Sequence, residues 1–165
     1  MCVSSVYLPH STRAAAFTLV CLTVLVASSC REFFDDSTKT KPDTGTLLGT
    51  WVPDKESLKH MREAGGYDIS NKTELVLEVN GTYKMNNIPD WLWLDDGLSQ
   101  KTLRSESGTW EVTRDADRPD WIVHLKTQMN ARSAALLGQH PPYTLRFSFG
   151  NIDSNPQSMT FFKEK

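Results

Sequence analysis

Three histidines are the first candidates for acid–base or metal chemistry after residue 30: His60, His124 and His140. None of them has another histidine or a cysteine at the spacing that zinc sites use. His124 falls at an outward-facing position of an alternating segment, which favours a surface side chain. The run 105–108 (SESG) does not place a serine nucleophile on a strand-to-helix turn. The residues therefore predict no catalytic residues, no metal site and no cofactor, and hence no enzyme.

A cluster of acids offers oxygen ligands of the kind that Ca²⁺ prefers. Asp115, Asp117 and Asp120 lie within six positions of one another. Basic residues and a proline interrupt the run, and it lacks the terminal bidentate glutamate of a calcium loop. We therefore interpret this segment as a solvated turn.

The N-terminal segment has the pattern of a secretory signal peptide. Arg13 is followed by an uncharged run over residues 14–26 (AAAFTLVCLTVLV), and small residues fill positions 27–29 before Cys30. The uncharged run is shorter than the roughly 20 apolar residues that a membrane-spanning helix needs. We expect residues 1–29 to be removed as a signal peptide.

Residues 26–30 (VASSC) resemble the lipobox of bacterial lipoproteins. In that family the cysteine thiol is diacylated, the signal is cut before it, and the new amine is acylated. The resemblance implies that Cys30 is lipidated and that its acyl chains hold the protein on a membrane. Ala27 stands where the family usually has leucine, and plain secretion is the alternative. Arg31, rather than aspartate, follows the cysteine, which favours the periplasmic face of the outer membrane.

Composition limits the partners of the chain. Lys and Arg number 18 against 20 for Asp and Glu, a net charge of −2, so no basic surplus is present to neutralise phosphates. A nucleic-acid partner is therefore not expected. Hydrophobic residues make up 39% and charged residues 23% of the chain, which is typical of a globular domain. A mean hydropathy of −0.41 excludes a polytopic membrane protein.

The chain after Cys30 divides into a polar segment and a strand-rich domain. Residues 31–45 (REFFDDSTKTKPDTG) show no hydrophobic period, so residues 30–45 are predicted to be the lipidated cysteine and a flexible tether. From residue 46 to 165 apolar residues mostly alternate with polar ones. One short helix is expected over 55–64, with Asp54 as its N-cap.

The alternating segments predict seven strands, and residues 127–141 are expected to be a loop or a short helical turn. Asn80-Gly81 predicts a hairpin with a type I′ turn. The pattern contains no strand–helix–strand crossover after the first strand, so an antiparallel meander that closes into a small barrel is expected. The fold class is therefore all-β with one short helix. The expected strands are residues 47–52, 74–79, 82–85, 108–112, 121–126, 143–149 and 159–162.

Three short motifs resemble lipocalins and the lipocalin-like domains of bacterial lipoproteins: Gly49-Thr50-Trp51, Asn80-Gly81-Thr82-Tyr83 and Gly108-Thr109-Trp110. The resemblance implies a lipocalin-like β-barrel, with Trp51 closing one end, that binds a small apolar molecule in its interior without catalysis. Inward-facing aromatic and sulfur-bearing side chains are the expected ligand contacts. They are Tyr83, Met85, Tyr143 and Phe147.

A second hypothesis concerns the segment 88–101, which carries Trp91 and Trp93 beside Asp95. Aromatic side chains in loops often anchor a protein partner. These three residues are therefore candidates for binding an envelope protein, as in a periplasmic inhibitor or immunity-type module. The alternative is that a tryptophan folds over the barrel mouth as a lid.

Overall fold

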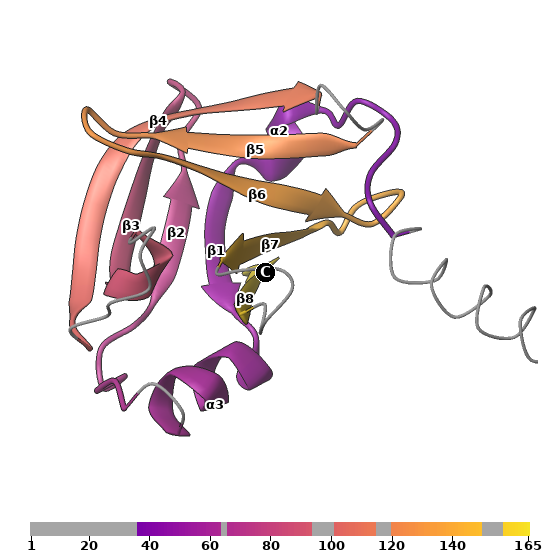
Figure 1. Ribbon diagram of the computed structural model, residues 1–165. Helices are drawn as coiled ribbons and strands as arrows, with labels where there is room; N and C mark the ends of the chain where they lie inside the picture. Colours follow the sequence, from indigo (N-terminus) through magenta and orange to yellow (C-terminus); the bar gives the residue numbers. More distant parts are fainter. Residues whose placement is uncertain (1–35, 64–65, 94–100, 115–119, 150–156) are drawn as a thin grey trace, which may run out of the picture. The chain divides into compact units, whose positions relative to one another are not determined.

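The computed structural model (Figure 1) describes residues 36–63, 66–93, 101–114, 120–149 and 157–165. Residues 37–165 belong to one compact unit. The helices of the described residues are too short or too polar to span a bilayer. The elements follow the chain as α2 (Thr44–Leu47), β1 (Gly49–Pro53), α3 (Lys55–Glu63), β2 (Glu74–Leu77), β3 (Thr82–Pro89), the 3₁₀ helix η2 (Asp90–Leu92), β4 (Leu103–Arg114), β5 (Trp121–Lys126), β6 (Ala131–Leu137), β7 (Thr144–Phe149) and β8 (Gln157–Lys163).

The eight strands of the described residues form a closed antiparallel barrel. Each strand pairs with the next one along the chain, and β1 also pairs with β8, with Val52 opposite Phe162. Figure 1 shows the strands winding round in sequence order. The predicted antiparallel meander and its closure into a small barrel, consistent with a lipocalin-like one, are confirmed. Closure leaves no unpaired sheet edge, which is the liability that open antiparallel sheets carry.

The sixth strand corrects the prediction of seven strands with a loop or helical turn at 127–141. Residues 131–137 (ARSAALL) form β6, between β5 and β7, and Ala134 and Leu136 are fully buried. Alanine and leucine are strong helix formers, which is why the segment does not look like a strand in the sequence. Two neighbouring strands supply the backbone partners that override this preference.

The hairpin between β2 and β3 has a different turn from the one predicted. Gly81 has a φ of +78°, whereas Asn80 is not in the left-handed region. The amide of Gly81 donates to the carbonyl of Glu78, and the amide of Glu78 donates to the carbonyl of Thr82. This is a three-residue loop, a turn followed by a glycine in the left-handed conformation, rather than the type I′ turn.

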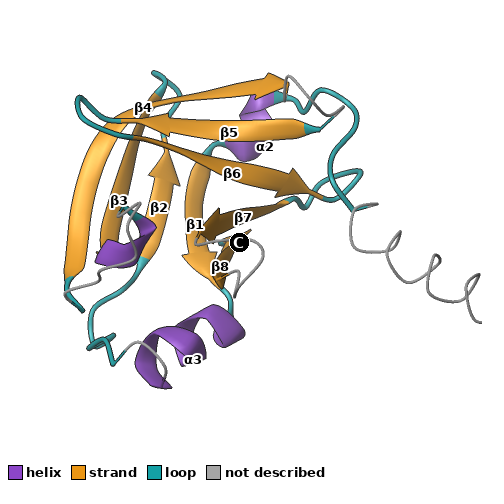
Figure 2. Ribbon diagram, viewed as in Figure 1, coloured by secondary structure: helices purple, strands orange, loops and turns teal. Residues whose placement is uncertain are grey.

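Helices lie at the two ends of β1 and therefore at opposite ends of the barrel (Figure 2). At the α2 end, Leu47 and Trp51 are fully buried, and Trp51 Nε1 donates a 2.9 Å hydrogen bond to the Leu47 carbonyl. In the interior, the rings of Phe147 and Phe161 pack edge to face with 5.6 Å between their centroids. Large side chains thus fill much of the barrel, as expected of an eight-stranded barrel.

The compact unit begins at Ser37, earlier than the predicted boundary at residue 46. Thr38 is fully buried, its amide donates to the Leu136 carbonyl, and its carbonyl accepts from the Trp121 amide. Ser37 forms an isolated bridge with Leu137. We call residues 37–41 the N-terminal strap. The strap is attached to the barrel by backbone hydrogen bonds and not by an apolar face. Its polar side chains therefore do not indicate an ordered segment in the sequence.

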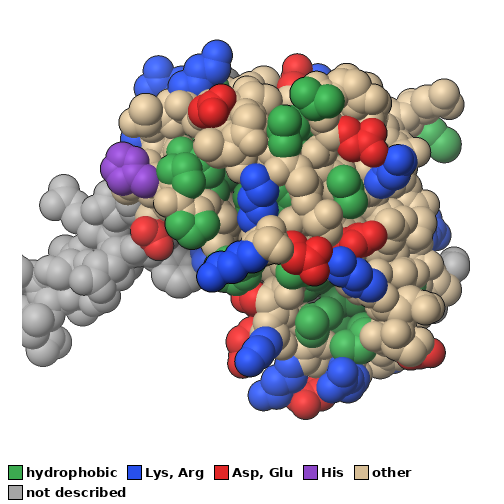
Figure 3. Space-filling model, turned by 180° about the vertical axis from the view of Figure 1, so that it is seen from behind, with side chains coloured by type: hydrophobic (Ala, Val, Ile, Leu, Met, Phe, Trp, Pro, Cys, Tyr) green, Lys and Arg blue, Asp and Glu red, His purple; other side chains and the backbone are tan. Residues whose placement is uncertain are grey.

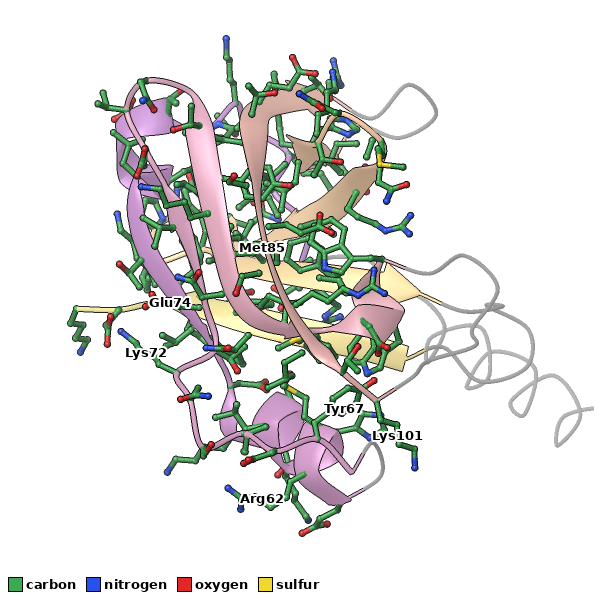
Figure 4. The ribbon with its side chains drawn as sticks, turned by 90° about the vertical axis from the view of Figure 1, so that its left-hand side faces the viewer. Arg62, Tyr67, Lys72, Glu74, Met85 and Lys101 are labelled. Atoms are coloured by element: carbon green, nitrogen blue, oxygen red, sulfur yellow. The ribbon has the colours of Figure 1, made fainter. Side chains whose placement is uncertain are left out.

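The outer surface of the barrel mixes charges of both signs. Figure 3 shows Lys or Arg and Asp or Glu side chains side by side on one face. Lys72 pairs with Glu74 at 3.1 Å and with Glu164 at 2.9 Å, and Figure 4 shows Lys72 and Glu74 on the same side of the barrel. Lys84 pairs with Glu78 at 2.8 Å. Exposed pairs of this kind contribute little to stability and keep the surface soluble.

Candidate functional site

One end of the barrel, the end where α3 lies, is covered by a cap. We define this cap as α3, residues 66–73 and η2. Asp54 begins α3 as predicted, because its side chain accepts a hydrogen bond from the Ser57 amide. Met61 of α3, Tyr67 and Leu92 are all buried in the common core. The cap therefore belongs to the hydrophobic core of the barrel.

A buried carboxylate links the two halves of the cap. Asp90 is fully buried, and its Oδ1 accepts a 2.8 Å hydrogen bond from the Tyr67 hydroxyl. Its Oδ2 accepts from the Thr102 hydroxyl at 3.1 Å. Figure 4 shows Tyr67 at this end of the barrel with Lys101 beside it. These hydrogen bonds satisfy a fully buried polar side chain, so they help to fix where the cap sits.

The two loop tryptophans pack onto the core at this same end. Trp93 is 4% exposed, and Trp91 is partly buried against the core. Asp95, the third candidate for partner binding, lies outside the described residues. Trp93 is thus buried in the core, whereas Trp91 keeps part of its surface exposed.

The four predicted ligand contacts all point into the barrel or its core. Tyr83 and Met85 of β3 are fully buried, Phe147 of β7 is 1% exposed and Tyr143 is 7% exposed. Tyr83 and Met85 lie on one face of β3 (Met85 in Figure 4), while Phe147 packs against Phe161. The structure places these side chains in the packed interior.

A pocket lined only by described residues lies in the wall of the barrel, beside β4. Its volume is about 540 Å³, within the range of about 300–1,000 Å³ that small-molecule sites occupy. Pairing between β4 and β5 begins at Thr109 and Lys126, so residues 103–108 of β4 extend past the last β5 residue. The β5–β6 connection lies opposite this overhang. The lining residues are Arg104, Glu106, Ser107, Thr127, Gln128, Met129 and Asn130.

Glu106 connects the pocket to the barrel interior. It is half-buried and stands opposite Met85 in the β3–β4 pairing, so both side chains take the inward face. Its Oε2 atom is buried and accepts no hydrogen bond from any described residue. Burial raises the pKa of the Glu106 carboxyl, and the positive charges of Arg104 and Arg132 only partly offset the shift.

Tyr83 is the inward neighbour of this carboxyl. Burial, and secondarily the negative charge of Glu106, raise the pKa of the Tyr83 hydroxyl to about 12. Like Glu106 Oε2, the Tyr83 hydroxyl is buried without a hydrogen-bond partner among the described residues. Buried polar atoms are nearly always hydrogen-bonded in native proteins, and exceptions often mark functional sites. Glu106 therefore has a buried oxygen that could accept a hydrogen bond and that receives none from the described residues.

Two arginines stand near Glu106 in different situations. Arg104 precedes it by two residues on the same face of β4, lines the pocket and is exposed. In the part of the chain that the structure describes, its guanidinium makes neither an ion pair nor a hydrogen bond. Arg132 instead donates from Nε to the Leu92 carbonyl at 2.6 Å, and so it helps to hold η2 of the cap.

Other groups capable of chemistry stay apart. No three His, Cys, Asp or Glu side chains of the described residues come together as a metal site. His124 lies on the outer face of β5 and its Nδ1 is 2.8 Å from the Ser133 hydroxyl on β6. Of the three acids of the predicted solvated turn, Asp115 and Asp117 lie outside the described residues, and Asp120 pairs with Lys39 of the strap at 2.5 Å.

No family model, curated protein or solved structure matches the chain. The pocket must therefore be interpreted from its own geometry. Sequence reasoning missed both Arg104 and Glu106. A signal was present, because Glu106 shares the even-numbered, inward-facing positions of β4 with Gly108 and Trp110. Burying a carboxylate at an inward position of a barrel strand is unfavourable unless it is paired, so such a residue is a candidate for a binding site. Here Glu106 lines the pocket.

Proposed function

We propose that this chain is a non-enzymatic binding protein of the bacterial cell envelope, which holds a small molecule in the pocket beside β4. The observation that carries the proposal is the position of Glu106. Its carboxyl lines a pocket of about 540 Å³, while its inner oxygen is buried with no hydrogen bond from the described residues. A ligand that donates to this carboxyl would offset the cost of burying it.

The pocket favours a ligand other than the one expected from the sequence. The resemblance to lipocalins implied an apolar molecule among Tyr83, Met85, Tyr143 and Phe147. Those side chains pack into the core, whereas the pocket offers charged and amide side chains at its wall. The ligand we propose is therefore polar at one end, and the barrel serves mainly as a rigid support for the site.

Attachment to the envelope is the second part of the proposal, and it rests on the sequence of residues 1–30. The signal-peptide pattern and the lipobox-like residues 26–30 support acylation of Cys30. Two or more acyl chains give stable anchoring, whereas one gives marginal binding. We place the domain on the periplasmic face of the outer membrane, because Arg31 rather than aspartate follows the cysteine.

Native mass spectrometry of the full chain, extracted from the membranes of its host, tests the binding function. We expect a bound small molecule in addition to the polypeptide and its acyl chains. Glu106→Gln should lose the bound mass. Glu111→Gln is the matched control, since Glu111 lies on the outer face of the same strand and pairs with Lys126. A wild-type protein that carries only polypeptide and acyl mass overturns the proposal.

A further inference from the structure

The pocket beside β4 is lined by one acidic and one basic side chain that form no ion pair with each other. Arg104 and Glu106 are two residues apart on the same face of the strand, and both line the pocket. Within the described ranges, neither side chain takes part in an ion pair. Two charged residues on the outer face of β3 and β4 differ in this respect, since Lys84 pairs with Glu78 and Glu111 pairs with Lys126.

The two charges present different chemistry to the pocket. Arg104 is exposed, and its planar guanidinium matches a carboxylate or a phosphate with two parallel hydrogen bonds. Glu106 lies deeper and is partly desolvated, so a group that donates hydrogen bonds and carries positive charge stabilises its ionised form. One molecule with both kinds of group satisfies both side chains at once.

The remaining lining residues fit the rest of such a molecule. Ser107, Thr127, Gln128 and Asn130 supply neutral donors and acceptors. Met129 is 90% exposed at the edge of the pocket, where its flexible thioether can cover a short aliphatic chain. The pocket thus combines a positive group, a negative group and one apolar contact.

We propose that the ligand of this pocket is a small zwitterion, whose ammonium group binds Glu106 and whose anionic group binds Arg104. The inference rests on the proposed binding function and specifies the class of ligand. A monovalent cation or anion leaves one of the two side chains without its partner, so it should bind more weakly.

Isothermal titration calorimetry of the full chain near pH 7, with three probes of matched carbon skeleton, tests this inference. The probes are norleucine, hexanoate, which lacks its ammonium group, and pentylamine, which lacks its carboxylate. A charge-assisted hydrogen bond in a partly buried site corresponds to about tenfold in affinity or more. We therefore expect norleucine to bind at least about tenfold more tightly than either of the other probes.

Two variants show which side chain binds the ammonium group of the ligand and which binds its carboxylate. Glu106→Gln should weaken norleucine and pentylamine and leave hexanoate unchanged. Arg104→Gln should weaken norleucine and hexanoate and leave pentylamine unchanged. Glu111→Gln and Arg114→Gln are matched controls on the same strand, because neither residue lines the pocket. Thermal unfolding of each variant verifies that it is folded.

A zwitterion of this kind comes either from solution or from a lipid head group such as phosphoethanolamine. A competition arm separates the two sources: vesicles that contain phosphatidylethanolamine are added to the norleucine complex, with phosphatidylglycerol vesicles as the control. If only the phosphatidylethanolamine vesicles displace norleucine, the natural ligand is a lipid head group. If neither kind of vesicle displaces norleucine, the natural ligand is a zwitterion taken from solution.

Two results overturn the inference. One is that hexanoate or pentylamine binds wild-type protein as tightly as norleucine. The other is that none of the three probes binds. Native mass spectrometry distinguishes these failures from failure of the proposed function: if the protein from its host still carries a bound molecule that is lost in Glu106→Gln, the pocket binds a ligand of another class.

Discussion

At the scale of single residues, the buried carboxyl of Glu106 makes the clearest prediction about pH. Its pKa is raised in the folded protein, chiefly by burial. The folded state therefore binds its proton more tightly than the unfolded chain does. The stability that the protonated form supplies is present below the ordinary pKa of a glutamate and is lost as the pH rises through the raised folded pKa.

Replacement of this residue should show the effect directly. We expect Glu106→Gln to raise the midpoint of thermal unfolding relative to wild type at pH 7. The difference should shrink as the pH falls through the raised folded pKa, and it should be gone below the ordinary glutamate pKa. Differential scanning calorimetry between about pH 3 and 8 measures it. Glu111, whose pKa is lowered first by its hydrogen bond with Lys126, is the control, because Glu111→Gln should not raise the midpoint at pH 7.

Gly108 illustrates a residue whose missing side chain matters. A Cβ atom at this position would lie 2.0 Å from the carbonyl oxygen of Lys126 and 3.0 Å from Cε1 of Tyr83. The carbonyl belongs to the backbone of the chain as it leaves β5, so it cannot rotate away. The glycine of the Gly108-Thr109-Trp110 motif thus permits the close approach of a neighbouring strand.

The corresponding prediction is that Gly108→Ala destabilises the fold by about 1–3 kcal/mol, the usual cost of overpacking. Urea denaturation of the two proteins measures the difference. Gly45→Ala is the control, since a Cβ there would meet only Asp43 side-chain atoms at 3.4 Å or more. Equal stability of Gly108→Ala and wild type would contradict the close approach.

At the scale of elements, the two halves of the cap are joined by a hydrogen bond from Tyr67 to Asp90 that sequence reasoning does not reveal. We expect Tyr67→Phe to lower stability by about 1–3 kcal/mol, because it removes a donor from the buried carboxylate of Asp90. Hydrogen exchange should become faster in α3. Tyr143→Phe provides the comparison, since Tyr143 is also buried but donates no hydrogen bond to a described residue. If both variants are equally stable, Asp90 does not depend on Tyr67.

The N-terminal strap leads to a prediction about the domain boundary. Thr38 makes two backbone hydrogen bonds, and its hydroxyl donates to the Gly138 carbonyl at 2.6 Å. At about 0.5–1.5 kcal/mol each, the loss of these three hydrogen bonds should cost about 1.5–4.5 kcal/mol. A chain that begins at residue 46 should therefore unfold at lower urea concentration than one that begins at residue 36. Identical midpoints would show that the strap adds nothing.

These elements also show how far the sequence alone leads. Strands with strict alternation, such as β5 and β7, are recognisable because one face must be apolar. β6 and the strap are not, since their partners come from distant parts of the chain and their composition favours other structures. Glu106 is visible as an inward carboxylate. The pocket itself is not, because it depends on where β5 stops relative to β4.

At the scale of the whole molecule, the core and the wall of the barrel have different features: the core is packed with large side chains, and the pocket lies in the wall. Side chains such as Trp51, Phe147 and Phe161 are buried in the interior, where they support the strands of the wall. The pocket lies where β4 extends past β5. A site on a rigid strand keeps Arg104 and Glu106 at a fixed separation, which is the condition for recognising a ligand with two charged groups.

The last prediction concerns the place of this molecule in the cell. Acyl chains on Cys30 should keep the full chain in the membrane fraction after a high-salt wash, because burial of hydrocarbon does not depend on ionic strength. Cys30→Ser should move the protein to the soluble fraction and remove the acyl mass. Cys21→Ser is the control, since position 21 lies within the predicted signal peptide. If Cys30→Ser stays with the membrane, the anchor is not this cysteine. The binding function would then stand without it, because the pocket belongs to residues 104–130 of the barrel.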